Sequence, residues 1–555
     1  MSSKDIPGIN WSADRLVPAF QTPKQLTIYD LRGTSMELLL SAATMAGLIN
    51  RPQPQVYLKF TDDDETWLKE LHAIPQATAH SAGNDVLKRM LTAFPNYAKG
   101  MVIYDPDFKD SINIATTIAG QNDCIIVSPA QARDLQQTHN LPVHTDLSSQ
   151  QWSNPSQAYD WARQNLLNGA SPHAVAGLNP ASQDPTIAGL RSFLVANRIF
   201  VYWLDTRHEK DLVEQIFKAF SPGALHFGWF IDEPSGVTLT SNAAMPVLAT
   251  DLFTNLEVWA GVPASIVRAT PVAPPPAISS RVYVSFTISD GDNLQYIQHR
   301  MLQRWQDSAR GSIPLGWTIS PVLSQAAPAM AAYYARTATA NDELIAGPSG
   351  AGYIFPSQWP EQQLPAFLQR TGQLMKSMNL TTLEVLDKSD FAAILEVLKQ
   401  AISTLVKLGQ AALILEVLRQ TISTLVSNIT DARNSQLFCN DKLQQSFVKE
   451  LSSIGLDGIL SGAGIKIPGL TFSTGGTPVY YNLGLANNVR SALDIAKNAA
   501  LIMKQRPLFL NVYILTWTMG PSDIKQVIQQ LGSEYQVVTP GTLLRMIAQA
   551  HSQGH

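Results

Sequence analysis

The sequence predicts an α/β protein in which small α/β subdomains precede a C-terminal TIM-like (β/α) barrel. Three observations favour this fold class. Short apolar strands alternate with helices over residues 1–270, prolines interrupt the chain at 271–279, and eight further strand segments alternate with helices over residues 280–555. Strand–helix alternation is typical of parallel sheets, and eight such units in about 275 residues match a (β/α) barrel.

The N-terminal region, residues 1–270, contains strand segments rich in β-branched and aromatic residues. These segments cover residues 25–30, 55–60, 101–104, 124–127, 198–204 and 225–231, and helices are expected at 35–48 and 111–118. An acidic run at residues 61–65 is expected to cap the next helix. The βαβ rhythm predicts two or three subdomains built on parallel sheets.

The linker at residues 271–279 separates the two regions. It contains Pro271, Pro274, Pro275 and Pro276. Proline has a fixed φ and no backbone N–H, so this segment suits neither a sheet nor a helix. The first barrel strand is expected directly after it.

The C-terminal region, residues 280–555, repeats a strand–helix unit. Strands are expected at 282–288, 315–319, 343–346, 382–386, 458–460, 478–481, 508–515 and 535–538. Helices are expected at 294–306, 325–336, 361–377, 442–453, 486–503, 522–530 and 541–550. Each strand runs into glycine or polar residues, which a closed ring would gather at one edge, where α/β barrels bind ligands. An open seven-stranded sheet would show nearly the same pattern.

A duplicated segment interrupts the barrel region. Residues 394–406 recur almost unchanged at 414–426, and Gly409 lies between the two copies. Apolar residues at helical spacing predict an αα-hairpin inserted at 390–431. It is either a structural elaboration of one barrel unit or a recent or engineered duplication. Its apolar faces suggest self-association as a homo-oligomer.

Composition restricts the partners of the protein. The net charge is −4 and the pI about 6.2, which offers no basic surface for nucleic acid. The two cysteines, Cys124 and Cys439, have no CxxC spacing, so we expect neither a thiolate zinc site nor a disulfide framework. We expect no cofactor and no membrane-spanning segment. Residues 1–19 lack a signal-peptide pattern, which fits a cytoplasmic protein or a secreted one whose leader has been removed.

The strongest candidate site follows the first barrel strand. Asp290, Asp292 and Asn293 lie on a glycine turn at the carboxyl end of that strand. Two carboxylates and an amide at this edge favour a ligand site. The alternative is that Asp290 or Asp292 merely caps the next helix. One cap needs one acid, so the cap does not account for the whole group.

Further candidates follow other strands. Trp229, Asp232 and Glu233 lie together after the strand at 225–231, where they serve either the same cleft or a domain interface. Trp317, Asn482 and Trp517 lie in or after barrel strands and are expected to bind substrate. Asp387 and Asp390 are lesser acidic candidates.

The run Gly350-Ala-Gly-Tyr-Ile-Phe-Pro356 resembles the signature of the GxGYxYP family of putative glycoside hydrolases, with Phe355 at the second tyrosine position. Similar matches to the family lie at residues 288–293, 316–321, 47–51 and 228–233. Gly350 and Gly352 permit positive φ or close approach of a ligand, and Pro356 completes the motif. Tyr353 and Phe355 would either stack on a sugar or pack beneath the site.

The resemblance implies a carbohydrate-active enzyme. Glycoside hydrolysis needs a carboxylic acid and a carboxylate, and Asp290 and Asp292 are the best pair, with Glu233 as a further acid. A polysaccharide deacetylase is a lesser alternative. Its zinc chemistry requires histidines, and the C-terminal region, residues 280–555, offers only His299, His551 and His555. A non-catalytic carbohydrate-binding or scaffold protein is the other alternative.

Overall fold

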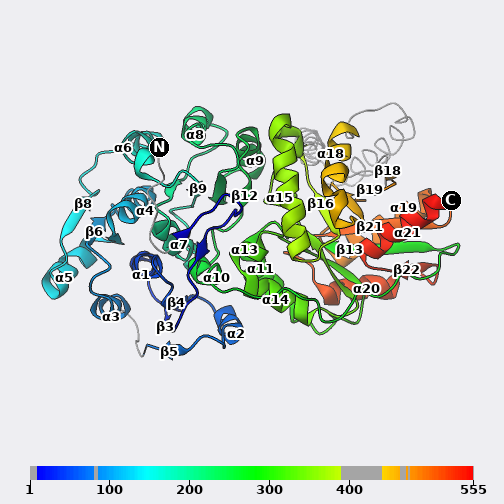
Figure 1. Ribbon diagram of the computed structural model, residues 1–555, viewed down its shortest axis with the longest axis horizontal. Coiled ribbons are helices and arrows are strands. Elements are labelled where there is room, and N and C mark those ends of the chain that lie inside the picture. Colours follow the sequence, from blue (N-terminus) through cyan, green and yellow to red (C-terminus); the bar gives the residue numbers. More distant parts are fainter. Residues whose placement is uncertain (1–8, 80–84, 389–440, 463–469, 473–475, 554–555) are drawn as a thin grey trace, which may run out of the picture. The chain divides into compact units, whose positions relative to one another are not determined.

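We describe residues 9–79, 85–388, 441–462, 470–472 and 476–553 in a computed structural model (Figure 1). The hairpin predicted at 390–431 lies outside these residues. The chain forms two compact units. The first comprises Met1–Arg268, Asn293–Leu302 and Val322–Thr337, and the second comprises Ala269–Asp292, Gln303–Pro321 and Ala338–His555.

The described part of the first unit contains three parallel sheets, as the βαβ rhythm predicts. Their orders are β4-β3-β5, β7-β6-β8 and β10-β9-β11-β12, and β1 pairs antiparallel with β2. The strands are β1 (Ile9–Asn10), β2 (Ala19–Phe20), β3 (Leu26–Asp30), β4 (Val56–Lys59), β5 (Gln76–Thr78), β6 (Gly100–Ile103), β7 (Cys124–Val127), β8 (Val143–Asp146), β9 (Ala174–Gly177), β10 (Phe200–Tyr202), β11 (Leu225–Gly228) and β12 (Val247–Leu248).

Helices connect and cover these sheets. They are α1 (Met36–Asn50), α2 (Asp63–Glu70), α3 (Val86–Ala93), α4 (Ser111–Asn122), α5 (Pro129–His139), α6 (Pro155–Leu166), α7 (Leu190–Ala196), α8 (Lys210–Phe217), α9 (Glu233–Asn242) and α10 (Leu256–Trp259).

The centre of the first unit is the buried helix α1. A Cβ on Gly47 would lie 2.3 Å from the carbonyl oxygen of Ser192, so only glycine lets α1 pack this closely on α7. Arg51 follows the helix and donates to the carbonyl oxygens of Gly120 and Val195 at 2.8 and 2.9 Å, near the ends of α4 and α7. A cation at helix C-termini is favourable, which gives the 47–51 run a structural function.

The second unit is the barrel. Its parallel strands are β13 (Val282–Ile288), β14 (Leu315–Ile319), β15 (Asp342–Ala346), β16 (Thr382–Val385), β17 (Gly458–Ser461), β19 (Pro478–Tyr481), β21 (Leu508–Ile514) and β22 (Tyr535–Val537), with the short strands β18 (Leu470–Phe472) and β20 (Leu485–Ala486). Each predicted barrel strand is present, and its ends differ from the prediction by at most one residue.

The barrel sheet curls back on itself. Its hydrogen-bonded order is β18-β19-β17-β16-β15-β14-β13-β21-β20, and β19 runs directly into β20 along the chain. Leu483, between these two strands, donates its N–H to the Asn511 carbonyl oxygen on β21 at 3.2 Å. The segment from β19 to β20 therefore borders both β17 and β21. The eighth strand, β22, pairs with Val282–Val284 of β13, whereas β14 pairs with Thr287 and Ile288.

The last helix, α21 (Pro540–Ser552), fills the amino-terminal end of the barrel. Its Leu543, Leu544 and Ile547 form a buried cluster with Tyr283, Ile345, Leu460 and Tyr480, which come from four different strands. The Gly541 N–H donates to Glu343 Oε2 on β15 at 3.0 Å. The apolar floor formed in this way leaves the carboxyl end of the barrel for polar residues.

The remaining helices of the C-terminal region match the expected segments, with two divisions. They are α11 (Leu294–Gln298), α12 (Arg300–Trp305), α13 (Leu323–Ala326), α14 (Pro328–Thr337), α15 (Leu364–Ser377), α18 (Asp441–Leu451), α19 (Val489–Ile502) and α20 (Pro521–Gln530). The predicted helix 325–336 is divided because Pro328 has no N–H and begins a new helix. The predicted helix 294–306 is divided at His299.

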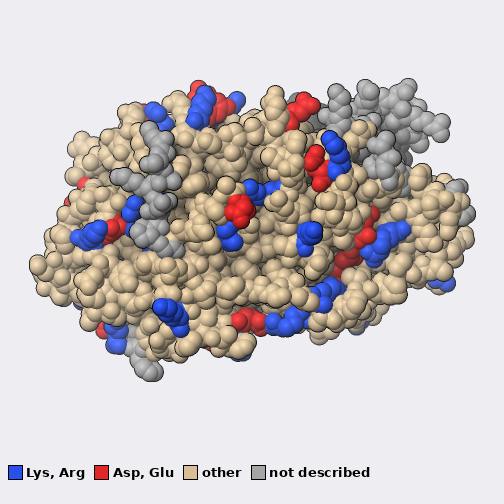
Figure 2. Space-filling model, viewed as in Figure 1, with Lys and Arg blue, Asp and Glu red and all other residues tan. Residues whose placement is uncertain are grey.

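No helix in the described part of the chain is both long and apolar enough to cross a bilayer. On the face shown in Figure 2, described Lys and Arg side chains alternate with Asp and Glu rather than gathering by sign.

Candidate active site at the carboxyl end of the barrel

The turn after β13 is held in an unusual conformation. Asp290 has φ +78°, in the left-handed region that a non-glycine residue seldom adopts. A Cβ on Gly291 would lie 2.2 Å from the carbonyl carbon of Thr318, and the Gly291 N–H donates to Thr318 Oγ1 at 2.8 Å. The turn is thus pressed onto the end of β14. Backbone strain of this kind is concentrated at functional sites.

The helix cap after this turn is Asn293. Its side-chain oxygen accepts from the Tyr296 N–H at 3.0 Å at the start of α11. The alternative that Asp290 or Asp292 caps the helix is therefore wrong. Asn293 belongs to the first compact unit, whereas both aspartates belong to the second. Both aspartates are partly exposed.

An exposed tryptophan contacts the first of these aspartates. Trp517, in the turn after β21, donates its indole N–H to Asp290 Oδ2 at 2.7 Å, and 47% of the residue is exposed. The main chain links the same two turns, since Thr516 N–H donates to Ser289 Oγ at 3.3 Å. The ends of β13 and β21 thereby present an aromatic ring and a carboxylate side by side.

Two residues that we did not predict lie inside the barrel. Tyr513 on β21 and Glu384 on β16 are both buried, and their strands are not neighbours in the sheet. Burial raises the pKa of the Tyr513 phenol well above its usual value, and the negative charges of Glu384, Asp290 and Asp292 raise it further. The phenol is therefore neutral at ordinary pH.

Further polar side chains lie in the barrel interior, on β13 and β21 and directly after β19. Asn511 accepts from the hydroxyls of Ser285 and Thr287 at 2.6 and 3.0 Å and donates to Asn482 Oδ1 at 2.6 Å. All four side chains are buried. The interior of a (β/α) barrel is usually filled by branched apolar residues. A polar upper half above an apolar floor is what a site for a polar ligand requires.

The loop that contains Tyr353 packs inward. Gly350 and Gly352 have φ +112° and +120°, and a Cβ on Gly350 would lie 2.3 Å from Thr371 Cγ2. Tyr353 and Phe355 are 2% and 0% exposed, and their rings meet edge to face with centroids 5.7 Å apart. Of the two expectations for these rings, packing beneath the surface matches this burial. The buried Pro356 then begins a short 3-10 turn.

Trp317 lies away from the mouth of the barrel. It is fully buried on β14, packs against Trp305 and donates its N–H to Asp342 Oδ1 at 3.0 Å. Asn482 is also buried, and it donates to the Gly462 carbonyl oxygen at 2.7 Å. The first of these side chains supports the barrel wall, and the second belongs to the polar interior.

The other predicted site residues lie in the first unit. Asp232 caps α9 by accepting from the Ser235 N–H at 3.1 Å, and Glu233 is the first residue of that helix. Trp229, directly after β11, is partly exposed and donates its main-chain N–H to Gly177 O at 2.9 Å. Arg207 approaches Asp232 Oδ1 at 3.8 Å. These residues lie at the carboxyl edge of the sheet β10-β9-β11-β12.

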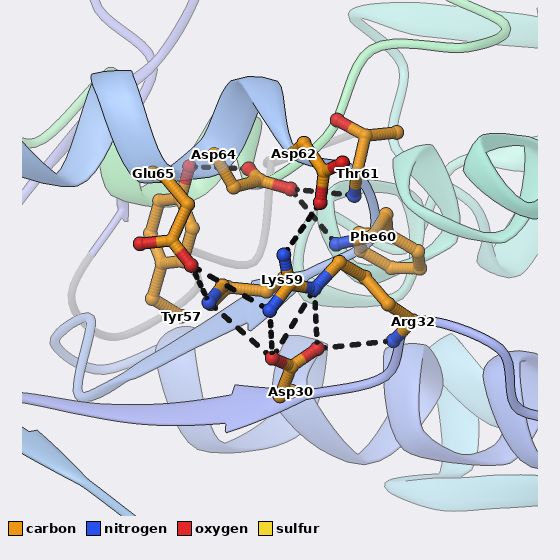
Figure 3. Close-up of polar contacts among 9 residues, drawn as sticks. All are labelled: Asp30, Arg32, Tyr57, Lys59, Phe60, Thr61, Asp62, Asp64 and Glu65. Atoms are coloured by element: carbon orange, nitrogen blue, oxygen red, sulfur yellow. Dashed lines mark hydrogen bonds and ion pairs between the residues drawn. The ribbon is translucent and has the colours of Figure 1, made fainter.

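A second charged cluster in the first unit has a structural function (Figure 3). Arg32 binds Asp30 and Asp62 at 2.5 and 2.6 Å, and Lys59 pairs with Asp30 and Glu65. The hydrogen bond from Arg32 lowers the pKa of Asp30 to about 2. The acidic run therefore neutralises the basic residues at the ends of β3 and β4.

The helix start beside this cluster differs from the prediction. Asp62 precedes α2 but makes no side-chain cap bond. Instead the buried Asp64 accepts from the N–H groups of Phe60 and Thr61 at 2.8 and 3.0 Å and from the Tyr57 hydroxyl at 2.7 Å. The acidic run thus serves the turn between β4 and α2 rather than a cap.

Metal ligands do not gather in the described residues. There, no group of three or more His, Cys, Asp or Glu side chains has the arrangement of a metal site. His299 lies in the first unit, where its Nδ1 is 3.1 Å from Asp63 Oδ2.

Three family models match the chain in the order expected. Residues 280–548 match the GxGYxYP putative glycoside hydrolase C-terminal domain, residues 98–170 match the GxGYxYP_N second domain, and residues 175–261 match the GxGYxYP third domain. No curated protein matches the chain.

A solved structure shares the fold. It is described as a putative hydrolase from Bacteroides thetaiotaomicron VPI-5482 and is 20% identical to this chain. The similarity covers 98% of this chain and 99% of that one with a TM-score of 0.78.

Proposed function

Because the chain belongs to the GxGYxYP family, described as putative glycoside hydrolases, we propose that it hydrolyses a poly- or oligosaccharide at the carboxyl end of its barrel. The family description, and the description of the similar structure as a putative hydrolase, support hydrolysis. The proposed location of the active site is supported by Asp290, Asp292 and Trp517, which all lie at the carboxyl end of the barrel in the second unit.

The contact between Trp517 and Asp290 carries this proposal. Sugar rings present apolar C–H faces and polar edges, so a carbohydrate site needs an aromatic surface beside hydrogen-bonding groups. The Trp517 residue is 47% exposed while its indole N–H is bonded to Asp290 Oδ2 at 2.7 Å. A sugar stacked on this ring would have its polar edge at the carboxylates.

The two aspartates have complementary functions in the proposed reaction. One carboxyl group donates its proton to the glycosidic oxygen as the C1–O bond breaks. The other carboxylate either takes a proton from the attacking water or attacks C1 itself, in which case water later displaces it. The anomeric configuration of the first product distinguishes these two courses.

Glu233 is a separate candidate for the acid. It lies in the first turn of α9 in the other compact unit. If it donates the proton, Glu233→Gln lowers kcat by about 100-fold or more. If both carboxyl groups come from the β13 turn, the same variant retains kcat within about threefold, which is the outcome we expect.

The experiment that tests the proposed function begins with binding. The purified protein is applied to a glycan array, and each bound glycan is then incubated with the protein and assayed for new reducing ends. Release of reducing ends that is lost in Asp292→Asn supports the proposal. Binding without cleavage indicates a carbohydrate-binding scaffold, and release of acetate instead of reducing ends indicates a deacetylase.

A further inference from the structure

The signature loop, which we define as residues 347–356, begins directly after β15 and contacts the turn that contains the two aspartates. A Cβ on Gly347 would lie 2.5 Å from the carbonyl carbon of Gly291 and 2.8 Å from the main-chain nitrogen of Asp292. Both distances are much shorter than an ordinary van der Waals contact. Only glycine at position 347 therefore lets the Gly291–Asp292 peptide lie where it does.

The end of β14 contacts the same turn. Thr318 Oγ1 accepts from the Gly291 N–H at 2.8 Å and donates to the Ile288 carbonyl oxygen at 2.7 Å. Gly347 is bonded to this strand as well, because its N–H donates to the Ile319 carbonyl oxygen at 3.0 Å. The turn after β13 thus lies against the ends of both β14 and β15.

The signature loop is held by buried hydrogen bonds. The Thr371 hydroxyl on α15 accepts from the Ala351 N–H at 3.0 Å. The Ser349 hydroxyl lies within hydrogen-bonding distance of two carbonyl oxygens, that of Ile354 at 3.1 Å and that of Leu386, directly after β16, at 3.4 Å. Thr371 and Ser349 are both fully buried. Because satisfied polar contacts in the interior are rigid, the loop is fixed to α15 and to the end of β16.

We propose that Gly347 is a positioning residue, and that the signature loop is the rigid support that fixes the place and direction of the Asp292 side chain. A reacting group must be held within about 0.5 Å of its productive position by the residues around it. The loop acts on the reaction through Asp292 rather than by stacking its aromatic rings on a sugar. The burial of Tyr353 and Phe355 agrees with this function.

This inference rests on the proposed function, because it requires Asp292 to perform the chemistry, and it predicts the size of the effect. A methyl group at position 347 must separate from Gly291 by roughly 1 Å more to reach an ordinary carbon–carbon contact. Residues 347–356 are all buried, whereas Asp290 and Asp292 are partly exposed, so the turn is expected to move and the loop to stay. A misplacement of about 1 Å lowers the rate by about 100-fold.

Gly316 provides a matched control for the test. It lies near the amino-terminal end of β14, where a Cβ would lie 2.3 Å from Pro540 Cγ at the start of α21. Gly316→Ala therefore introduces an equally close contact at the opposite end of the barrel from the aspartates. Steady-state kinetics on one cleaved glycan and the melting temperature are measured for Gly347→Ala, Gly316→Ala and the unmodified protein.

We expect Gly347→Ala to lower kcat by about 100-fold while KM stays within about twofold. Gly316→Ala should retain kcat within about threefold although its melting temperature falls by a similar amount. An unchanged kcat in Gly347→Ala, or equal losses of kcat in the two variants, would overturn the inference.

A pair of substitutions at Thr371 loosens the loop without adding an atom, and it decides the inference if Gly347→Ala does not fold. Thr371→Val removes the acceptor for the Ala351 N–H, whereas Thr371→Ser keeps it. We expect Thr371→Val to lower kcat about tenfold, a smaller loss because nothing is forced into the turn, and Thr371→Ser to retain most of it. The same kcat in both variants would count against the inference.

Crystal structures of Gly347→Ala and of the unmodified protein test the inference without turnover. The Cα of Asp292 should move by about 1 Å relative to β13, β14 and β15, while residues 349–356 stay in place. If the protein cleaves no glycan, the proposed function fails, and these structures still show whether the loop sets the position of Asp292. A loop that moves while the turn stays would refute the inference.

Discussion

Trp517 and Asp290 are joined by a 2.7 Å hydrogen bond that links the ends of β21 and β13, two strands far apart in sequence and adjacent in the barrel. The bond fixes one oxygen of a carboxylate that sits on a strained backbone, and it leaves much of the indole ring exposed. The pair thus combines a positioned acid with an aromatic surface.

Substitutions of Trp517 should separate these two functions. Trp517→Phe keeps a ring but removes the donor to Asp290, so we expect kcat to fall while KM stays within about twofold. Trp517→Ala removes the ring as well and should also raise KM about tenfold, the scale of one aromatic contact. Steady-state kinetics on the same glycan measures both. Equal KM values for the two variants would show that the ring does not contact substrate.

The electrostatic influence of Glu384 on Tyr513 should be visible in the free energy of unfolding. Tyr513→Phe removes the neutral phenol, whose pKa the Glu384 charge raises, and we expect a loss of about 2 kcal/mol in the free energy of unfolding. In a double-mutant cycle with Glu384→Gln the second substitution should cost less than it does alone, because the charge is already gone. Urea unfolding of the four proteins provides the cycle. Strictly additive losses would mean that the two side chains do not interact.

Two glycines of the second unit form a matched pair. Gly350 has φ +112° and no room for a Cβ, whereas Gly455 has φ +68° with nothing within 4 Å of a Cβ. Gly350→Ala should therefore lose about 3 kcal/mol of stability, from both the backbone and the contact with Thr371, and Gly455→Ala only about 1 kcal/mol. Denaturant unfolding measures both. Similar losses of stability in the two variants would indicate that the loop at Gly350 can shift to accommodate a Cβ at little cost.

The first unit should lose stability in acid because of His226. This histidine is fully buried, its Nε2 is 3.0 Å from the Tyr202 hydroxyl, and burial lowers its pKa to about 3. The neutral ring is favoured in the folded state, so stability is retained above the unfolded pKa of about 6.5 and lost as pH falls toward 3. At about pH 5 the loss should be about 2 kcal/mol.

This prediction is checked by measuring the free energy of unfolding of two variants across pH. His226→Phe is expected to unfold more easily at neutral pH but to lose less further stability on acidification than the unmodified protein. His144→Gln changes an exposed histidine and should follow the unmodified protein at every pH. The same acid-induced loss in His226→Phe would assign the effect to other groups.

Much of the barrel follows from local sequence. The eight strand segments are β-branched or aromatic and bounded by polar residues, so their positions can be found without a tertiary model. Asp290 and Asp292 can be found as well, because two acids on a glycine turn after a buried strand exceed what a helix cap needs. Pro328 marks a helix break that we overlooked, although proline in a helix interior is a clear local signal.

The interior of the site could not be predicted in the same way. Glu384 is one polar residue within a strand, and its sequence neighbours do not show which wall of a curled sheet it faces. Its charge acts on Tyr513 between strands that are not neighbours, and this effect therefore depends on the curvature of the whole sheet. The burial of Trp317 likewise depends on its packing against Trp305 of α12, and the inward packing of the loop at Gly350 depends on Thr371 of α15, which hydropathy does not encode.

The central claim is that the carboxylates of the β13 turn perform the chemistry, and replacing each aspartate by asparagine tests it most directly. Asn keeps the size and hydrogen bonding of the side chain but cannot donate or accept the catalytic proton. We predict that Asp290→Asn and Asp292→Asn each lower glycan hydrolysis by at least about 100-fold while the melting temperature changes by only a few degrees. Full activity in both variants would contradict the account.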